Sequence, residues 1–137
     1  MSGVSTAGPG ADGGVYDVVG DRVLGLAVET PLPWVRVLVI SGELDQQTAP
    51  RLVACVDAQL DAGAEHVVLD LSRLNLLSPV GLATLAEVQT MVSAVGATLH
   101  LAGICRPAVI GPVQDHWQPE VFAIHRTTIE ALAAISG

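Results

Sequence analysis

The feature that most constrains the fold is an alternation of short runs of Val, Leu and Ile with longer segments of helical periodicity. The strand-like runs cover 22–29, 35–41, 66–71, 97–102 and 121–124. The helical segments cover about 50–62, 79–95 and 128–135, and a further helix could begin at 108. Strands that alternate with helices predict an α/β fold: a single domain in which α-helices cover a mixed, largely parallel β-sheet.

The helix after residue 78 has the best-defined start. Ser78 is a favoured N-cap residue, and Pro79 suits the first helical position because no helical N–H is needed there. The apolar positions that step by three or four residues, and so predict a buried face, are Gly81, Leu85, Val88, Val92 and Val95. A neighbouring mixed face, which we expect to be an exposed contact surface, carries Val80, Thr84, Glu87 and Met91.

Two other helices have recognisable ends. Thr48 can cap a helix with Pro50 in its first turn and Gly63 as its stop. Thr127, followed three residues later by Glu130, forms a capping box at the start of the last helix. Between 104 and 119 a helix could begin after Pro107, but the Gly-Pro pair at 111–112 should interrupt it within about a turn.

Residues 1–20 are rich in Gly, Ala, Ser and Asp and have no periodic apolar face, so we expect a flexible N-terminal tail followed by one domain over 21–137. The start of the chain lacks the basic and apolar regions of a signal peptide. The longest aliphatic runs are much shorter than the roughly 20 apolar residues of a membrane-spanning helix. We therefore expect a cytoplasmic protein.

Charge excludes two classes of partner. The chain has no Lys, six basic residues in all and a net charge of −8. Without a basic patch it cannot neutralise nucleic-acid phosphates, and anionic lipid would repel it. We expect neither a nucleic-acid nor a membrane partner. Because aromatic residues make up only 3% of the chain, aliphatic side chains must build the core.

Motifs for cofactor, metal and catalytic chemistry are missing from the sequence. There is no phosphate-binding Gly-Lys-Ser/Thr loop and no Gly-x-Ser-x-Gly nucleophile elbow. The histidines have no metal-ligand spacing, which favours solvated or core-edge positions for His66, His100, His116 and His125. We expect no cofactor, no metal and no enzymatic activity.

Two pairs of residues leave alternatives open. Asp45 and Asp70 lie near the carboxyl ends of predicted strands, where they could serve as acid and base or, as we favour, hold turns and caps. Cys55 and Cys105 match no disulfide framework. Buried structural thiols are the commoner case, and a redox-switched pair is the alternative.

Two stretches carry a family resemblance: Gly-Glu-Leu-Asp at 42–45 with Thr-Ala-Pro-Arg-Leu at 48–52, and Val-Leu-Asp-Leu-Ser-Arg-Leu-Asn-Leu-Leu-Ser-Pro-Val-Gly-Leu at 68–82. They resemble the signature regions of the STAS domain, the fold of bacterial anti-sigma factor antagonists. The resemblance implies transcription regulation by protein binding: the domain binds an anti-sigma factor, usually a kinase-like ATP-binding protein, and frees a sigma factor.

The resemblance also points to a departure at the control site. The family corner typically has the sequence Asp-Ser-Ser-Gly, and the partner kinase phosphorylates its first serine. Here the corner is Ser78, Pro79, Val80 and Gly81. Because Pro79 has no hydroxyl group, ordinary phosphorylation should not switch this chain. Ser78 is one residue displaced, and serves either as a helix cap or as a shifted phosphorylation site.

The resemblance places a partner surface at one end of the sheet and on the exposed face of the second helix. Its members are Asp45, Gln46, Gln47, Arg73, Asn75, Ser78, Pro79, Val80, Thr84 and Glu87. The interrupted 104–112 region departs from the third helix expected of the family. The alternative function is a scaffold or small-ligand sensing module outside the sigma pathway, which could form a homodimer.

Overall fold

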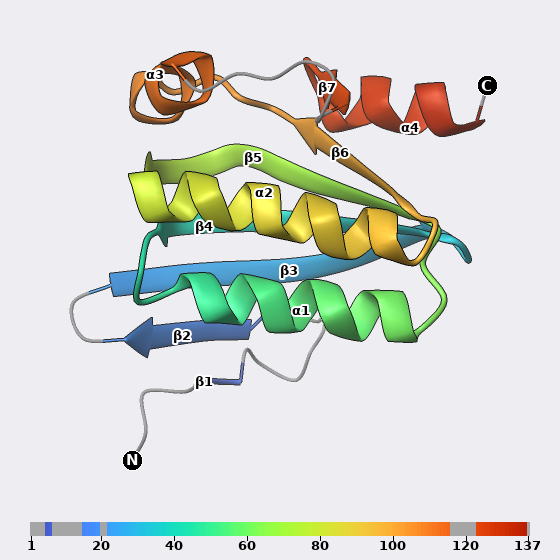
Figure 1. Ribbon diagram of the computed structural model, residues 1–137, viewed down its shortest axis with the longest axis horizontal. Coiled ribbons are helices and arrows are strands. Elements are labelled where there is room, and N and C mark those ends of the chain that lie inside the picture. Colours follow the sequence, from blue (N-terminus) through green and yellow to red (C-terminus); the bar gives the residue numbers. More distant parts are fainter. Residues whose placement is uncertain (1–4, 7–14, 20–21, 116–122, 137) are drawn as a thin grey trace.

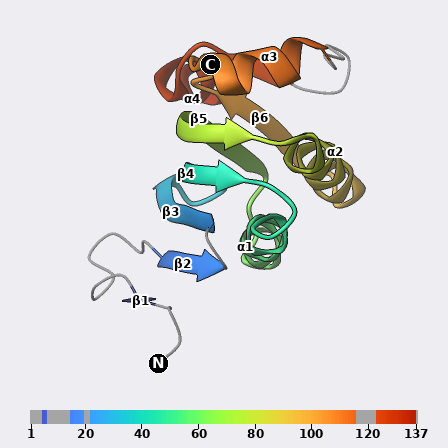
Figure 2. The ribbon, with the colours of Figure 1, turned by 90° about the vertical axis from the view of Figure 1, so that its left-hand side faces the viewer.

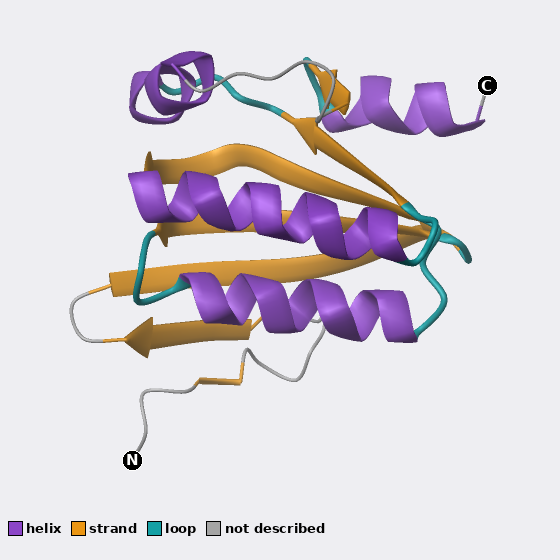
Figure 3. Ribbon diagram, viewed as in Figure 1, coloured by secondary structure: helices purple, strands orange, loops and turns teal. Residues whose placement is uncertain are grey.

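The computed structural model describes residues 5–6, 15–19, 22–115 and 123–136. The strands are β1 (Ser5–Thr6), β2 (Val15–Val19), β3 (Arg22–Leu32), β4 (Val35–Leu44), β5 (His66–Leu77), β6 (Thr98–Ala102) and β7 (Ala123–His125). The helices are α1 (Ala49–Asp61), α2 (Pro79–Ala94), α3 (Pro107–Asp115) and α4 (Thr128–Ser136). Figure 1 shows their arrangement, and Figure 3 separates helices from strands by colour.

The described strands form one sheet in the order β1-β2-β3-β4-β5-β6-β7. The pairs from β1 to β4 are antiparallel, and those from β4 to β7 are parallel. Over the five strands β3–β7 the sheet is therefore mixed and mostly parallel, which confirms the predicted α/β class. Figure 2 shows α1 and α2 side by side on one face of the sheet.

Two layers of apolar side chains hold the sheet. The larger lies under α1, α2 and α3 and includes Leu38, Leu69 and Leu101, all at most 1% exposed. The smaller lies on the opposite face, where Ala131 of α4 packs with Val68 and its neighbours. Because successive strand residues point to opposite faces, β5 is buried on both sides, as its apolar sequence predicts.

Within residues 1–20, for which the sequence predicts a flexible tail, the structure has β1 and β2, and β2 pairs with β3. The apolar residues of β2 alternate too briefly to stand out in the sequence. The sheet edge offered by β3 supplies the backbone partners that such a short strand needs. The flexibility of this segment and the boundary at residue 21 stay predictions.

Two local expectations were wrong. The helix α3 continues through Gly111 and Pro112 to Asp115, because Val109 and Val113, one turn apart, are buried in the larger core and offset the cost of the proline. The family's third helix is therefore present. Val95 is 64% exposed because α2 ends one residue earlier. The predicted strand residues 121 and 122 lie outside the described residues.

Candidate functional site

The loop after β4 is a tight hydrogen-bonded turn. The Oδ1 atom of Asp45 accepts hydrogen bonds from the backbone N–H of Gln47 at 2.9 Å and of Thr48 at 3.2 Å. The prediction that the side chain of Thr48 caps α1 was wrong. Its hydroxyl instead accepts from the N–H of Asp45 at 3.0 Å and donates to the carbonyl of Glu43 at 2.8 Å. Asp45 therefore has the turn role that the sequence favours.

The loop after β5 begins α2 as predicted. The Oγ of Ser78 accepts a hydrogen bond from the N–H of Gly81 at 3.0 Å, which is the N-cap contact, and Pro79 occupies the first turn. The N–H of Ser78 donates to the carbonyl of Leu44 at 3.0 Å. This last bond joins the two signature loops, because Leu44 is the last residue of β4 and immediately precedes Asp45.

The two loops together line an open cleft of about 390 Å³. Its walls are Asp45, Gln46, Gln47, Ser78, Pro79 and Val80. Val80, a large apolar side chain in its wall, is 45% exposed to solvent. Exposed apolar groups with a polar rim are typical of a surface that docks another protein.

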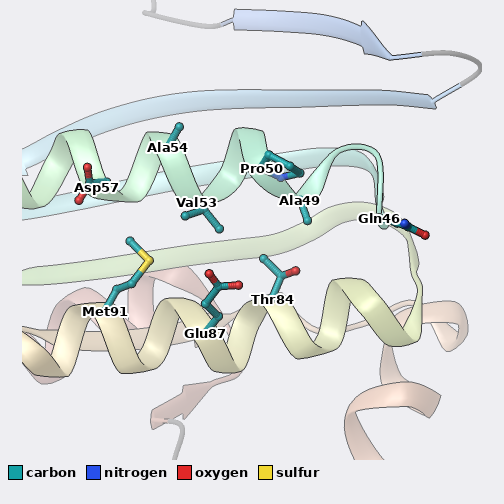
Figure 4. A pocket seen from close by; sticks show the side chains of 9 residues that line it. All are labelled: Gln46, Ala49, Pro50, Val53, Ala54, Asp57, Thr84, Glu87 and Met91. Carbon is teal, nitrogen blue, oxygen red and sulfur yellow. The ribbon is translucent and has the colours of Figure 1, made fainter.

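A groove of about 630 Å³ continues from this cleft between α1 and α2 (Figure 4). Gln46 contributes to both the cleft and the groove. The groove has apolar walls that include Val53 and Met91, and acidic groups at Asp57 and Glu87. We call the cleft and the groove together the loop-and-groove surface.

The predicted partner residues separate into two groups. Eight of the ten line the loop-and-groove surface: Asp45, Gln46, Gln47, Ser78, Pro79, Val80, Thr84 and Glu87. Thr84 is only 5% exposed, against the prediction of an open helix face, because α1 packs beside it and its hydroxyl donates to the carbonyl of Val80 at 2.9 Å. Asn75 is exposed on β5.

Arg73 lines a different cleft, of about 430 Å³, on the face of the sheet that carries α4. Asp70 lies in the same cleft, where its Oδ1 accepts a hydrogen bond from the N–H of Ser72 at 2.9 Å. The strand β5 runs on to residue 77, so Asp70 lies inside the strand and not at its end. Asp45 and Asp70 therefore line separate clefts, and each holds a turn or irregular backbone segment.

The two cysteines are free thiols. Cys55 is half-buried on α1, and burial raises the pKa of its thiol. Cys105 is exposed after β6, with its sulfur 3.8 Å from the carbonyl oxygen of Ser72. The helix α1 and the segment before α3 lie at opposite ends of the layer in Figure 1. Their pairing stays a prediction.

Three of the four histidines lie together, which sequence reasoning missed. His66, His100 and His125 occupy neighbouring strands, and their ring nitrogens are 3.1 Å apart in both contacts. These residues become neighbours through the pairing of β5 with β6 and of β6 with β7, and this pairing cannot be derived from the spacing of the histidines in the sequence. Among the described residues, no group of His, Cys, Asp and Glu has the geometry to hold a metal ion. His116 lies outside the described residues.

Comparison with known families identifies the chain. The STAS domain model matches residues 28–130, which include both signature loops. This chain belongs to the STAS domain family. No match was found among the curated proteins. In the described part of the chain, no helix is long and apolar enough to cross a membrane.

Solved structures share the fold. An anti-sigma factor antagonist from Mycobacterium paratuberculosis has 27% identity and a TM-score of 0.72, over 83% of this chain and 95% of the other. Unphosphorylated SpoIIAA, an anti-sigma factor antagonist, has 18% identity and a TM-score of 0.69, over 82% and 96%. The phosphorylated form of SpoIIAA from Bacillus has 16% identity and a TM-score of 0.62, over 80% and 98%.

Proposed function

We propose that this chain is an anti-sigma factor antagonist that binds an anti-sigma factor, a kinase-like ATP-binding protein, and so releases a sigma factor. The observation that carries the proposal is the hydrogen bond from Ser78 N–H to the Leu44 carbonyl, which fastens the two signature loops into one surface. The relative from Mycobacterium paratuberculosis, described as an anti-sigma factor antagonist, supports the proposal.

The chemistry of the loop-and-groove surface suits a protein partner. Val80 offers exposed apolar area at its corner, and apolar burial is the main driving force of protein association. Asp57 and Glu87 make the groove acidic, and the whole chain has a net charge of −8. The partner's docking face should therefore be basic, with an apolar centre.

Pro79 takes the usual phosphoacceptor position and has no hydroxyl group. The hydroxyl of the adjacent Ser78 is already used as the helix cap, 3.0 Å from the N–H of Gly81. We therefore propose that ordinary phosphorylation does not switch this antagonist off. A phosphate of about −2 charge, which would repel an acidic or apolar interface, has no acceptor at the family position.

A binding experiment with matched charge variants tests the surface. Purified chain is titrated against the kinase-like anti-sigma factors of the source organism, and affinity is measured by calorimetry. Val80→Asp should weaken binding at least tenfold, because it places a carboxylate in the apolar corner. Ile129→Asp, at a residue 80% exposed on α4, should leave affinity unchanged. Binding to none of these proteins, or equal loss in both variants, contradicts the proposal.

A phosphorylation experiment tests the control separately. The chain is incubated with its anti-sigma partner and ATP, and its peptides are analysed by mass spectrometry. The unaltered chain should gain no phosphate, whereas Pro79→Ser should gain one at residue 79. A phosphate on Ser78 of the unaltered chain would refute the unswitched antagonist while leaving the binding proposal intact.

The groove between α1 and α2 supports a second candidate function. Its volume of about 630 Å³ is within the range of small-molecule sites, and its walls combine apolar and acidic groups. In this alternative the domain is a ligand-sensing or self-assembling module. A thermal-shift response to a metabolite, abolished by Met91→Asp, would favour it. Sedimentation as a monomer with no ligand response would remove it.

A further inference from the structure

Three imidazole rings form a continuous row across the sheet on the face that carries α4. His66 comes from β5, His100 from β6 and His125 from β7. The Nδ1 of His66 lies 3.1 Å from the Nε2 of His100, and the Nδ1 of His100 lies 3.1 Å from the Nε2 of His125. The ring centroids are 5.4 and 5.2 Å apart. His100 thus uses both of its ring nitrogens within the row.

The hydrogen bonds in this row have one direction. A neutral imidazole has one N–H donor and one acceptor nitrogen. If His100 donates to His125, it must accept from His66, and if it donates to His66 it must accept from His125. All three rings therefore share one tautomer, with the proton on Nδ1 throughout or on Nε2 throughout. Because His100 turns different nitrogens to its two neighbours, one metal ion could not be bound by all three.

We propose that this row is a pH-sensitive clasp that fastens β7, and with it α4, to the sheet and opens as the row takes up protons. A first added proton keeps both hydrogen bonds, because a doubly protonated His100 can donate to both neighbours, but it places a positive charge on a buried ring. A second added proton must place two N–H groups against each other at one of the two contacts. That contact then loses its hydrogen bond and brings two positive charges together.

When the row is protonated, we expect β7 and α4 to detach from the sheet before any other element. β7 is three residues long and, in the described part of the sheet, pairs only with β6. The apolar layer under α4 is small, with Ala131 as its buried residue on the helix. Segments with little buried apolar area open most easily. By contrast, α1 and α2 are anchored in the larger core.

The electrostatic surroundings favour the neutral row. His100 is 7% exposed, and burial, followed by the charges of His125 and His66, lowers its pKa to about 4. No carboxylate in the described part of the chain compensates for a proton there. On β5, Asp70 binds the N–H of Ser72, and on α4, Glu130 binds the N–H of Arg126.

The remaining cations near these strands are turned elsewhere. Arg36 of β4 reaches Gln59 of α1 on the other face of the sheet, with its Nε 3.1 Å from the amide oxygen. Arg126, which follows β7, is exposed to solvent. The pKa of His100 is therefore governed by burial and by the two neighbouring rings.

The sign of the pH effect follows from the lowered pKa. Above pH 6.5, His100 is neutral in the closed and opened states alike, so the clasp keeps its full contribution. As the pH falls from 6.5 towards 4, His100 becomes protonated in the opened state but stays mostly neutral in the closed state, so the opened state is increasingly favoured. The opening equilibrium constant should rise about 20-fold between pH 7 and pH 5 from His100 alone.

Amide hydrogen exchange followed by mass spectrometry tests the clasp in the whole chain. After correction for intrinsic exchange rates, protection of 123–136 should fall by about 20-fold between pH 7 and pH 5. Protection of 49–61 and 79–94 should change much less. No change in 123–136, or an equal loss in all three segments, overturns the proposal.

Two variants separate the clasp from general acid instability. His125→Gln keeps a hydrogen-bonding side chain that cannot take up a proton, so the loss of protection of 123–136 between pH 7 and pH 5 should be clearly smaller than in the unaltered chain. The part that remains comes from the burial of His100. His66→Gln removes the other end of the row but leaves the contact between His100 and His125, so the pH dependence should persist. Equal behaviour of the two variants overturns the proposal.

Nitrogen-15 NMR at pH 7.5 should show one shared tautomer for the three histidines. Mixed tautomers would likewise contradict the proposal.

Discussion

The substitution Gly81→Ala gives the sharpest test of how the two signature loops are held together. A Cβ atom at residue 81 would meet the backbone of Leu44: its carbonyl oxygen lies closest, and its carbonyl carbon would be at 2.9 Å. The Cδ1 of Leu77 would be at 3.0 Å. Ordinary contacts of a Cβ lie at 3.4–4 Å. Leu44 cannot retreat freely, because its carbonyl also accepts the hydrogen bond from Ser78.

The expected cost follows from three contributions. Overpacking against a fixed backbone costs about 1–3 kcal/mol. Weakening the Ser78 to Leu44 hydrogen bond adds about 0.5–1.5 kcal/mol. Replacing a helical glycine by alanine returns about 1 kcal/mol of helix propensity. The free energy of unfolding should therefore fall by about 1–3 kcal/mol, and Tm by roughly 3–15 °C.

The matched control is Gly111→Ala in α3, where an added Cβ would meet no atom within 4 Å. This change should leave stability unchanged or raise it by up to about 1 kcal/mol, through helix propensity alone. Both variants are compared with the unaltered chain by urea denaturation and calorimetry. A Gly81→Ala chain as stable as the Gly111→Ala chain would refute the close approach of α2 to β4.

Three further predictions concern the core, the cap and the thiols. Leu69→Ala, at a fully buried position on β5, should lower the free energy of unfolding in urea by about 2–5 kcal/mol, and a loss under 1 kcal/mol would contradict its burial. Ser78→Ala should cost about 1 kcal/mol in the same assay, whereas Ser78→Asp, which can still cap, should cost little, and equal losses would argue against the cap. Cys55 should react with iodoacetamide at pH 8 more slowly than the exposed Cys105, because burial raises the pKa of the Cys55 thiol and lowers its thiolate fraction. Mass spectrometry of the labelled peptides measures the two rates, and faster labelling of Cys55 would contradict its burial.

Local chemistry made the helix ends predictable. Ser78 caps α2, and the Oγ1 of Thr127 accepts the predicted hydrogen bond from the N–H of Glu130, because each contact joins residues only three apart. The carboxylate of Glu130 accepts from the N–H of Arg126 and not, as the capping box predicts, from that of Thr127. Local chemistry also misled where packing was stronger. Pro112 should break α3, yet the burial of Val109 and Val113 keeps the helix intact to Asp115.

The alternation of strands and helices, the start of the second helix at Ser78 and the family motifs could be predicted from the sequence, since they depend on residues close together in the chain. The folded structure was needed to show that the hydrogen bond from Ser78 to Leu44 joins the two motifs and that Arg73 lies on the opposite face of the sheet from them. It alone brought together His66, His100 and His125, which are 34 and 25 positions apart. The physical reason is that strand order and register, set by packing across the whole sheet, determine which distant residues become neighbours.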